Sequence, residues 1–448
     1  MRLSKLAKTI FDDILSQGGE VYVVGGSVRD MLLKRRDSHD IDVEVYHMTY
    51  AKLYDVLKKY GNVNTYGKSF AIMSVDTLAG YDFALPRSEK KTGDLHTDFD
   101  IIVDPELSLE KAIQRRDLTI NALMYDYQNN EIIDLCHGID DLQNKIIRCV
   151  NPTSFVEDPL RVLRIAQFVA RFEMSVEEET CRLCQDMVKR GMLNHLSNER
   201  VYGEYCKILM ANRPSLGFEF LKEIGGLPSF LYDLTKTHQR PDYHPEGDVF
   251  EHTMLVLDVA ALMKQKTDEP LSFMWSCLLH DIGKPLVTTS EGSAPYHSSK
   301  GVEVFKDIRL IQSKKMRTYI ETMIMYHMNL MVMSRKNAPD HRYLRILKMI
   351  EGKVSLNDLI LISCCDKLGR GKVVYEQYYH FWDYIHDKTE RLGIAPPVAL
   401  VGGVDLIESG FKDKNLYSQL LEEAYEMQLL GNDKETILRS LKSQYEQG

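Results

Sequence analysis

The hydrophobic pattern of the chain changes about a third of the way along its length. Between about residues 20 and 150, short runs rich in β-branched residues alternate with helical stretches, and we expect strands over 21–26, 41–46, 69–76, 80–85 and 131–135. After about residue 155, strand patterns nearly vanish and apolar residues recur at helical spacing to the end. Strands confined to one part of a chain and helices to the rest are typical of an α+β protein, here with a mixed sheet at the N-terminal side.

The length of 448 residues predicts about three domains at ~150 residues each. A polar stretch that carries Pro and His at 237–248 marks one boundary inside the helical part. We expect a mixed domain at 1–140, a helical domain at 141–240, a second helical domain at 241–390, and a helical C-terminal segment at 391–448.

Composition excludes several classes of protein. The charged fraction is 27% and the net charge is −9, which excludes a polybasic binder, so contact with nucleic acid would need a local basic face. No apolar run approaches the ~20 residues that cross a bilayer, and the N-terminus lacks the uninterrupted apolar region of a secretory signal. The 8 cysteines are scattered and are interpreted as reduced thiols, so we expect a cytoplasmic protein without membrane contact.

Carboxylates recur at every second position of one predicted strand. Asp40, Asp42 and Glu44 share one face of the 41–46 segment, and Asp82 is a candidate from a neighbouring strand. Clustered carboxylates repel one another unless cations neutralise them. Two magnesium ions would serve nucleotidyl transfer, one lowering the pKa of the attacking hydroxyl and one stabilising the leaving pyrophosphate. Taken alone, such a pattern is more often a solvated face of a strand.

Two glycines precede this strand. Gly25 and Gly26 lead into a predicted helix that carries Arg29. Glycines let backbone N–H groups approach phosphate oxygens, and the N-terminus of a helix favours anions. A glycine pair alone is usually a turn, but the order strand, glycine pair, helix with arginine, acidic strand is far more specific.

A stripe of charged residues begins the first long helix of the helical part. Asp158, Arg161 and Arg164 follow one another at spacings of three. Carboxylate acceptors and a planar guanidinium fork match the Watson–Crick edges of cytosine and adenine. The alternative is an ordinary surface salt bridge between residues three apart, which the spacing alone favours.

The second half of the chain carries a spaced set of histidines and aspartates. An apolar helix is predicted to end at His280-Asp281, stopped by Gly283 and Pro285. The remaining candidates for ligands of a divalent metal are His252, His297, His327 and Asp366. Imidazole and carboxylate without cysteine suit Mn, Fe, Ni, Zn, Co or Mg. Each histidine alone is more often a core or surface residue than a ligand.

Six motifs occur in the order found in class II tRNA nucleotidyltransferases, the family of bacterial CCA-adding enzymes and poly(A) polymerases, and the chain resembles that family over nearly its whole length. The motifs are GGSVRD (25–30), HDIDVEVY (39–46), RRDLTINAL (115–123), IIDLCHGIDDLQNK (132–145), EDPLRVLR (157–164) and ERVYGE (199–204). The segment 81–99 looks like the strand and flexible loop between the head and neck of that family.

The resemblance implies a nucleotidyltransferase head of the polymerase β type, followed by a helical neck and body. It implies that Asp40 and Asp42 bind two Mg²⁺ ions. Gly26, Arg29 and Arg116 would contact the incoming nucleotide, while Asp158 and Arg161, with Arg164 nearby, would select CTP and then ATP for addition to tRNA. Glu44 fits the branch of the family that carries a hydrolase domain and receives no role. Gln167 stands where some relatives have an arginine, which puts that contact in question.

The histidines and aspartates resemble the HD phosphohydrolase superfamily, whose members hydrolyse phosphomonoesters and phosphodiesters with a metal-activated water. His252, His280, Asp281 and Asp366 match its four core ligands, and His297 and His327 would complete a second metal site. The resemblance implies phosphatase, 2′-nucleotidase or 2′,3′-cyclic phosphodiesterase activity.

Other interpretations stay open. The same fold would suit an A-adding, C-adding or poly(A)-adding enzyme, and a protein of another class would bind RNA with both sites inactive. Basic residues at 34–36, Arg87, Lys90 and Lys91 would line an RNA path or would simply be solvated charges. The sequence specifies neither the metal of the histidine site nor the oligomeric state.

Overall fold

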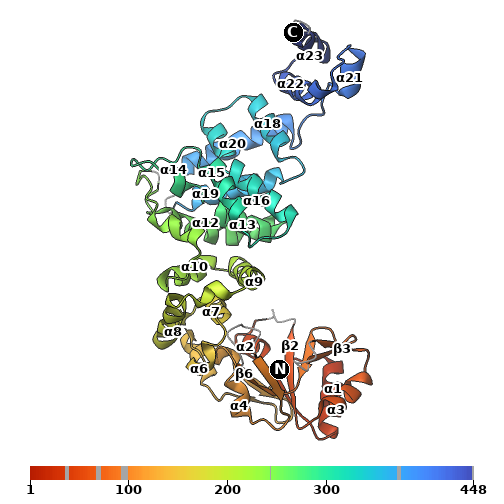
Figure 1. Ribbon diagram of the computed structural model, residues 1–448, viewed down its shortest axis with the longest axis vertical. Helices are drawn as coiled ribbons and strands as arrows, with labels where there is room; N and C mark the ends of the chain where they lie inside the picture. The colour runs from red at the N-terminus through yellow and green to blue at the C-terminus, as the bar shows by residue number, and fades with distance from the viewer. Residues whose placement is uncertain (36–39, 67–71, 92–98, 243, 371–374, 446–448) are drawn as a thin grey trace. The chain divides into compact units, whose positions relative to one another are not determined.

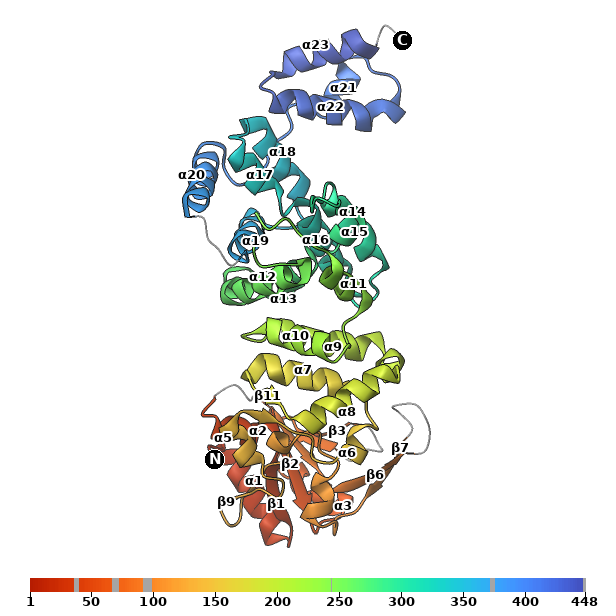
Figure 2. The ribbon, with the colours of Figure 1, turned by 90° about the vertical axis from the view of Figure 1, so that its left-hand side faces the viewer.

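The computed structural model describes residues 1–448 except 36–39, 67–71, 92–98, 243, 371–374 and 446–448. The chain forms two compact units, Met1–Leu227 and Pro228–Gly448, and each is described by itself (Figure 1, Figure 2). The first unit holds the strands of the main sheet, and the second is built from helices, as the sequence predicted. The division into four domains at 140, 240 and 390 stays a prediction.

A seven-stranded sheet forms the centre of the first unit, in the order β3-β4-β5-β2-β1-β8-β9. Its β2 and β5 strands pair in parallel and the other neighbours are antiparallel, so the sheet is mixed. The strands are β1 (Glu20–Val24), β2 (Ile41–Tyr46), β3 (Val63–Tyr66), β4 (Ile72–Val75), β5 (Tyr81–Ala84), β8 (Met124–Asp126) and β9 (Glu131–Ile133). A separate antiparallel pair is made by β6 (Arg87–Lys91) and β7 (Phe99–Val103), and a short parallel pair by β10 (Ile146–Ile147) and β11 (Ser175–Val176).

Alternation along β2 decides which side chains enter the core. Val43 and Val45 are fully buried, and the α1 helix (Lys5–Ser16) packs on β1 and on the α3 helix (Tyr50–Lys58). Phe11 of α1 meets Phe83 of β5 edge to face, with 6.1 Å between ring centroids. A second cluster, which includes Tyr22, Tyr46, Ile113 and Met124, completes the core of the unit. The sheet is therefore fixed by apolar contacts on residues that alternate with the acidic ones.

Strands β1, β2, β4, β5 and β9 of the main sheet were predicted, whereas β3 and β8 of that sheet and the two smaller strand pairs were not. All three residues of β8 are buried, so it lacks the alternation by which a half-exposed strand is recognised. Its position is set by antiparallel pairing with β1, a contact over about 100 residues of chain that no local pattern reveals.

Helices complete the first unit. The α7 helix packs on α9 and α10, which gives its buried face a partner (Figure 2). Pro159 caps α7, where its missing N–H costs nothing, and the Asp158 carboxylate accepts from Leu160 N at 3.1 Å. The helices are α2 (Gly26–Leu32), α4 (Leu109–Ile113), η1 (Thr119–Asn121), α5 (Gly138–Asn144), α6 (Pro152–Phe155), α7 (Leu160–Phe172), α8 (Glu178–Lys189), η2 (Met192–His195), α9 (Asn198–Leu209) and α10 (Pro214–Glu223).

The core of the second unit consists of α12, α13 and α19, most of whose residues are buried. A smaller apolar cluster joins α21, α22 and α23 near the C-terminus. The helices are α11 (Ser229–Tyr232), η3 (Asp233–Lys236), α12 (Val249–Met263), η4 (Lys264–Lys266), α13 (Pro270–Leu279), α14 (Lys284–Val287), α15 (His297–Asp307), α16 (Lys314–Tyr326), α17 (Asn329–Arg335), α18 (Asp340–Ile350), α19 (Leu356–Leu368), α20 (Tyr375–Leu392), α21 (Gly403–Glu408), η5 (Lys414–Leu416), α22 (Tyr417–Leu429) and α23 (Lys434–Tyr445).

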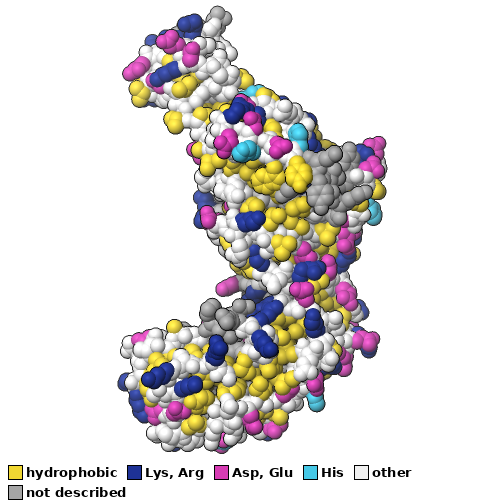
Figure 3. All heavy atoms as spheres, turned by 180° about the vertical axis from the view of Figure 1, so that it is seen from behind, with side chains coloured by type: hydrophobic (Ala, Val, Ile, Leu, Met, Phe, Trp, Pro, Cys, Tyr) yellow, Lys and Arg dark blue, Asp and Glu magenta, His cyan; other side chains and the backbone are white. Residues whose placement is uncertain are grey.

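The surface bears on two expectations from composition. None of the described helices is both long enough and apolar enough to cross a membrane. Figure 3 shows several Lys and Arg side chains set among hydrophobic ones on one face of the first unit. A negative net charge therefore coexists with locally basic surface.

Candidate functional site

The predicted acidic residues of the first unit gather where β2 and β5 run side by side. Asp42 and Asp82 are register partners across the parallel pair, and Asp40 lies two residues before Asp42. All three are exposed to solvent. Partial desolvation raises the pKa of Asp42, and the charges of Asp82, Glu44 and Asp40 act in the same direction against the opposing charge of Arg116. Desolvation and then Asp40 raise the pKa of Asp82. The carboxylates thus repel one another, and a divalent cation would relieve that repulsion.

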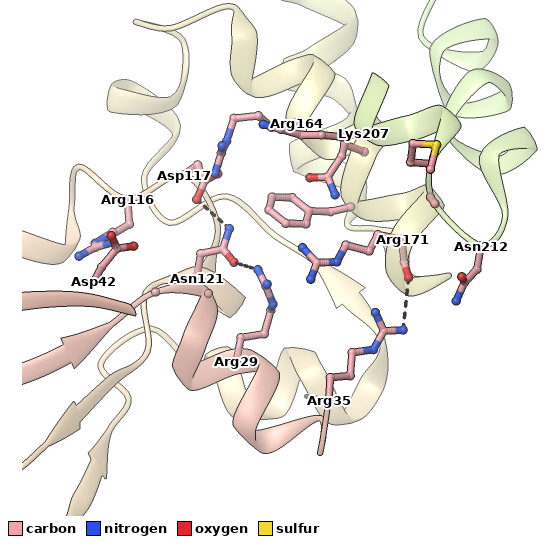
Figure 4. Close-up of a pocket in the computed structure, with 16 residues that line it drawn as sticks. Arg29, Arg35, Asp42, Arg116, Asp117, Asn121, Arg164, Arg171, Lys207 and Asn212 are labelled. Atoms are coloured by element: carbon pink, nitrogen blue, oxygen red, sulfur yellow. Dashed lines mark hydrogen bonds and ion pairs between the residues drawn. The ribbon is translucent and has the colours of Figure 1, made fainter. Parts of the chain in front are cut away.

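Asp42 lies at one end of a cavity of about 770 Å³ (Figure 4). Gly25 adopts a φ of +74°, and a Cβ built there would lie 3.3 Å from Arg116 Nη1 and 3.8 Å from Asp42 Oδ2. Glycine at this position therefore allows both the backbone conformation and the close approach of the two side chains. The cavity is lined by Gly25, Gly26, Arg29, Arg35, Asp42, Arg116, Asp117, Asn121, Arg164, Gln167, Phe168, Arg171, Lys207, Met210, Ala211 and Asn212.

Arg29 lies in this cavity as a buried member of a network. Its guanidinium bonds to Asp30 at 2.7 Å and donates to the Oδ1 atom of Asn121. Asn121 donates to Asp117 at 3.0 Å, and Asp117 accepts from Arg164 at 2.7 Å. Burial lowers the pKa of Arg29, against the opposing effect of Asp30. The network joins α2 of the sheet region to α7, so it holds the two sides of the cavity in register.

Glu44, which received no role from the sequence, anchors two arginines. Its carboxylate is 3% exposed and accepts from Arg115 at 2.5 Å, from Arg116 at 2.7 Å, and from Tyr46 at 3.2 Å. Burial works against ionisation, but Arg116 and Arg115 outweigh it and lower the pKa of Glu44. The ionised carboxylate fixes the Arg116 guanidinium beside Asp42.

Replacement of Glu44 by Ala should lower the free energy of unfolding by about 3 kcal/mol, because two guanidinium groups lose their buried partner. It should also release the Arg116 guanidinium from its position in the cavity. Urea unfolding measures the loss of stability, with exposed Glu110→Gln as the control. Wild-type stability in Glu44→Ala would contradict the anchoring role.

The stripe predicted on α7 is only partly in the cavity. Arg164 lines it, whereas Asp158 and Arg161 do not. Asp158 pairs with Arg200 at 2.9 Å, and Arg161 donates to the carbonyls of Ser154 and Arg115, both at 2.8 Å. The alternative prediction was an ion pair between Asp158 and Arg161. The described residues do not form this pair.

Several residues of the cavity were not among the predicted site residues. Asp117 and Asn121 stand inside the RRDLTINAL motif, and Arg171 continues the stripe of Arg164 two helical turns later. Lys207 and Asn212 gave no signal, because they reach the cavity only when α9 and α10 pack on α7. Of the predicted basic path, Arg35 lines the cavity and Arg87 is half-buried, Lys34 lies outside the lining, Arg36 falls outside the described residues, and the side chains of Lys90 and Lys91 are not described.

The predicted histidines and aspartates of the second unit converge in its core. His252 Nε2 lies 3.0 Å from Asp366 Oδ1, and His280 Nε2 lies 3.1 Å from Asp281 Oδ2. The other carboxylate oxygen of Asp281 lies 3.4 Å from His297 Nε2 and 3.8 Å from His327 Nε2. The structure therefore brings all six residues together, with Asp281 at the centre.

Each ring is held from behind through its Nδ1 atom. His280, His297 and His327 donate from Nδ1 to the carbonyls of Cys277, Ala294 and Ile324, all at 2.8 Å. His252 contacts Glu246 at 2.8 Å with its Nδ1. Since a carbonyl oxygen only accepts, Nδ1 of His280, His297 and His327 carries the proton, and the lone pair of each of these neutral rings lies on the Nε2 atom that faces the cluster.

The residues of the cluster differ in the direction in which their pKa values are shifted. Burial opposes ionisation of Asp281, but His280 and Lys284 outweigh it and hold the pKa of Asp281 well below its usual range. Burial and the neighbouring histidines lower the pKa of His327 to about 3. His252 differs, because its hydrogen bonds with Asp366 and Glu246 overcome burial and raise its pKa.

This donor set fits a divalent metal ion. The Nε2 atoms of His297 and His327 face each other at 3.4 Å although both Nδ1 atoms carry the protons, an arrangement that a cation between them would stabilise. His280 Nε2 is buried and has no hydrogen-bond partner among the described residues. Imidazole nitrogens with carboxylate oxygens and no thiolate suit a catalytic metal better than a structural zinc site.

A smaller cavity of about 160 Å³ opens beside the cluster. Asp281, His297 and Asp366 line it together with the cations Lys284 and Arg370. Lys284 Nζ lies 2.6 Å from Asp281 Oδ2 and donates to Gln239 at 2.7 Å. Lys284, Arg370, Glu246 and the cavity-lining His244 were not predicted from the sequence. The helix end at His280 is confirmed, because α13 ends at Leu279 with His280 as its C-cap, and Gly283 and Pro285, which follow it, begin the short α14 helix.

Three family descriptions match consecutive parts of the chain. The poly A polymerase head domain matches residues 21–148, the probable RNA and SrmB-binding site of polymerase A matches residues 173–236, and the HD domain matches residues 249–368. The first two include the cavity-lining residues on either side of α7 but not α7 itself, and the third covers the histidine cluster.

Similar proteins are known over most of the chain. The multifunctional CCA protein of Methylobacillus flagellatus is 35% identical over 80% of this chain and 85% of its own length. That of Pasteurella multocida is 32% identical over 90% of this chain and 94% of its own. An apo CCA-adding enzyme has a similar fold, with a TM-score of 0.66, 22% identity, and coverage of 99% and 97% of the two chains. Enzymes of that fold have been solved with tRNA, CTP and ATP.

Proposed function

This chain belongs to the family of multifunctional CCA proteins, and on that premise we propose that it adds C, C and A to the 3′ ends of tRNA from CTP and ATP, and that it hydrolyses phosphate esters at its HD site. One observation supports the first activity above all. Asp42 and Asp82 are register partners on neighbouring strands, and Asp42 lies at one end of a cavity that the Gly25-Gly26 turn also lines.

In the first unit, Asp40, Asp42 and Asp82 would hold Mg²⁺. Bound there, the ions supply activation of the primer hydroxyl and stabilisation of the leaving pyrophosphate. The Gly25-Gly26 backbone and the start of α2 receive the triphosphate, with Arg116 beside it. Arg29 contacts Asp30 and Asn121, and these contacts fix the positions of the side chains at this end of the cavity.

Selection of the base is assigned to Asp158, Arg161 and Arg164. Arg164 already faces the cavity, held by Asp117. Asp158 and Arg161 are bound to other groups in the structure. To contact the Watson–Crick edge of a base, Asp158 must first break its ion pair with Arg200, and Arg161 must break its hydrogen bonds with two backbone carbonyls. Nucleotide selection therefore includes a rearrangement at the start of α7.

In the second unit, His252, His280, Asp281 and Asp366 would hold a divalent metal, and His297 and His327 would complete a second site. A metal bound there supplies an activated water for hydrolysis. Lys284 and Arg370 place positive charge in the adjoining cavity, which suits the anionic group of a phosphomonoester or a 2′,3′-cyclic phosphate. Repair of damaged RNA 3′ ends before nucleotide addition would use both activities.

The extension products distinguish CCA addition from the alternative activities of the same fold. With tRNA that lacks its terminal triplet, we expect CTP alone to add two residues and CTP with ATP to add three. Long A tails from ATP alone would instead identify a poly(A)-adding enzyme. Retained RNA binding without turnover at either site would identify a non-catalytic RNA-binding protein. Sizing of the products on a denaturing gel distinguishes these outcomes.

A further inference from the structure

The cavity of the first unit extends well past the residues assigned to the nucleotide. Its far end is lined by Arg35, Arg171, Lys207 and Asn212 (Figure 4). Arg171 follows Arg164 by seven residues on α7, which places its Cα about 10 Å further along the helix. A nucleotide held between the Gly25-Gly26 turn and Arg164 leaves this end free.

The far end is built around one aromatic ring. The guanidinium groups of Arg29, Arg171 and Arg35 lie 4.6, 5.0 and 4.9 Å from the centre of the Phe172 ring. Asp30 neutralises them in part, at 2.7 Å from Arg29 and 3.3 Å from Arg171, and the charge of Asp117 also acts on Arg29. Stacking on the ring restrains the arginine side chains, so three positive charges are held close together in advance of any ligand.

Lys207 and Asn212 extend this surface from the helices that follow. Lys207 is about half-exposed, lines the cavity and pairs with Glu204 at 2.7 Å. The described lining at this end includes no Asp or Glu, in contrast to the end that holds Asp42. An anion with hydrogen-bond acceptors and hydroxyls fits this combination of guanidinium, ammonium and amide groups.

We propose that the far end of the cavity, formed by Arg35, Arg171, Lys207 and Asn212, binds phosphodiester groups of the tRNA strand that is being extended. The proposal rests on the proposed nucleotide addition, because it divides one cavity between the two substrates of that reaction. The triphosphate occupies the Asp42 end and the RNA backbone occupies the Phe172 end. Arginine forks recognise phosphates without reading sequence, which suits an enzyme that accepts many tRNAs.

The test is a binding titration that needs no turnover. The equilibrium Kd of wild type and of Arg35→Gln, Arg171→Gln and Lys207→Gln is measured by fluorescence anisotropy, with labelled tRNA lacking its terminal triplet and no nucleotide. We expect each variant to raise the Kd about tenfold at ~0.1 M salt, and to reduce the slope of log K against log salt by about 0.7 for each lost phosphate contact. The KM for CTP and ATP should change less than about twofold. Lys58→Gln, at an exposed lysine of α3 outside the cavity lining, is the control and should behave as wild type.

Two results would overturn the proposal. One is an unchanged Kd and salt slope in all three variants. The other is a raised KM for CTP or ATP with wild-type tRNA affinity, which would assign this end to the nucleotide. If Arg171→Gln fails to fold, Arg35→Gln and Lys207→Gln decide the matter, and Arg171→Lys should retain the salt slope because it keeps the charge. Wild-type protein that binds tRNA but never extends it would contradict the proposed function while the Kd series still tests the phosphate site.

Discussion

Replacement of Asp42 by Asn should lower the rate of nucleotide addition at least about a thousandfold, which corresponds to ~4 kcal/mol of transition-state stabilisation. Asn keeps the shape of the side chain but removes the charge that would bind Mg²⁺ beside Asp82. We expect that Asp40 and Asp82 cannot replace it, because of the three carboxylates only Asp42 is in the described cavity lining. The loss should appear in kcat, measured by extension of tRNA at saturating CTP and ATP.

Asp55→Asn provides the matched control for this change. Asp55 is an exposed aspartate on α3, on the same unit but outside the cavity lining, so its extension rate should equal that of wild type. Asp82→Asn tests the partner across the parallel strands and should also reduce the rate. Full extension by Asp42→Asn would remove the metal site from the mechanism and with it the proposed first activity.

Replacement of His280 by Ala should reduce hydrolysis of a 2′,3′-cyclic phosphate at least about a hundredfold and should lower the metal content of the protein. His280 is fully buried, and its bond to the Cys277 carbonyl leaves a buried Nε2 atom beside Asp281. Removal of this nitrogen takes away one of the proposed ligands and leaves the Asp281 charge less compensated. Hydrolysis with added Mn²⁺, Ni²⁺, Co²⁺ or Mg²⁺ and elemental analysis measure the two effects.

The control for the second site is His386→Ala. His386 is exposed on α20, so its removal should change neither hydrolysis nor metal content. Thermal unfolding of His280→Ala separates loss of a ligand from loss of the fold. Equal hydrolysis rates in His280→Ala and wild type would refute the assignment of this cluster as the phosphohydrolase site.

The family and the fold class were accessible from the sequence. Six ordered motifs predicted the class of nucleotidyltransferase, and this is confirmed by the matching head and HD descriptions and by the curated relatives. The alternation of β2 predicted both its buried face and its acidic face, since side chains of a strand alternate whatever the rest of the chain does. The residue types and spacing of the histidines and aspartates likewise predicted a cluster in the helical half.

The contact partners of individual charged side chains could not be predicted from the sequence. Glu44 looked like a third member of the acidic set, yet it is buried under Arg115 and Arg116. Asp158 and Arg161 share a helix stripe, yet their partners come from α9 and from the chain before α7. Each outcome depends on a partner that local spacing does not specify.

The sequence by itself determined which residues could carry the chemistry, because residue type, alternation and motif order are local properties of the chain. Only the tertiary structure decided which of them meet. Parallel pairing of β2 with β5 sets Asp82 beside Asp42, and the tertiary packing brings Arg29 and Arg35 to Phe172 of α7. These contacts join residues 40 to 140 positions apart, and they form because burial of apolar surface holds the strands and helices together at positions that no short stretch of sequence encodes.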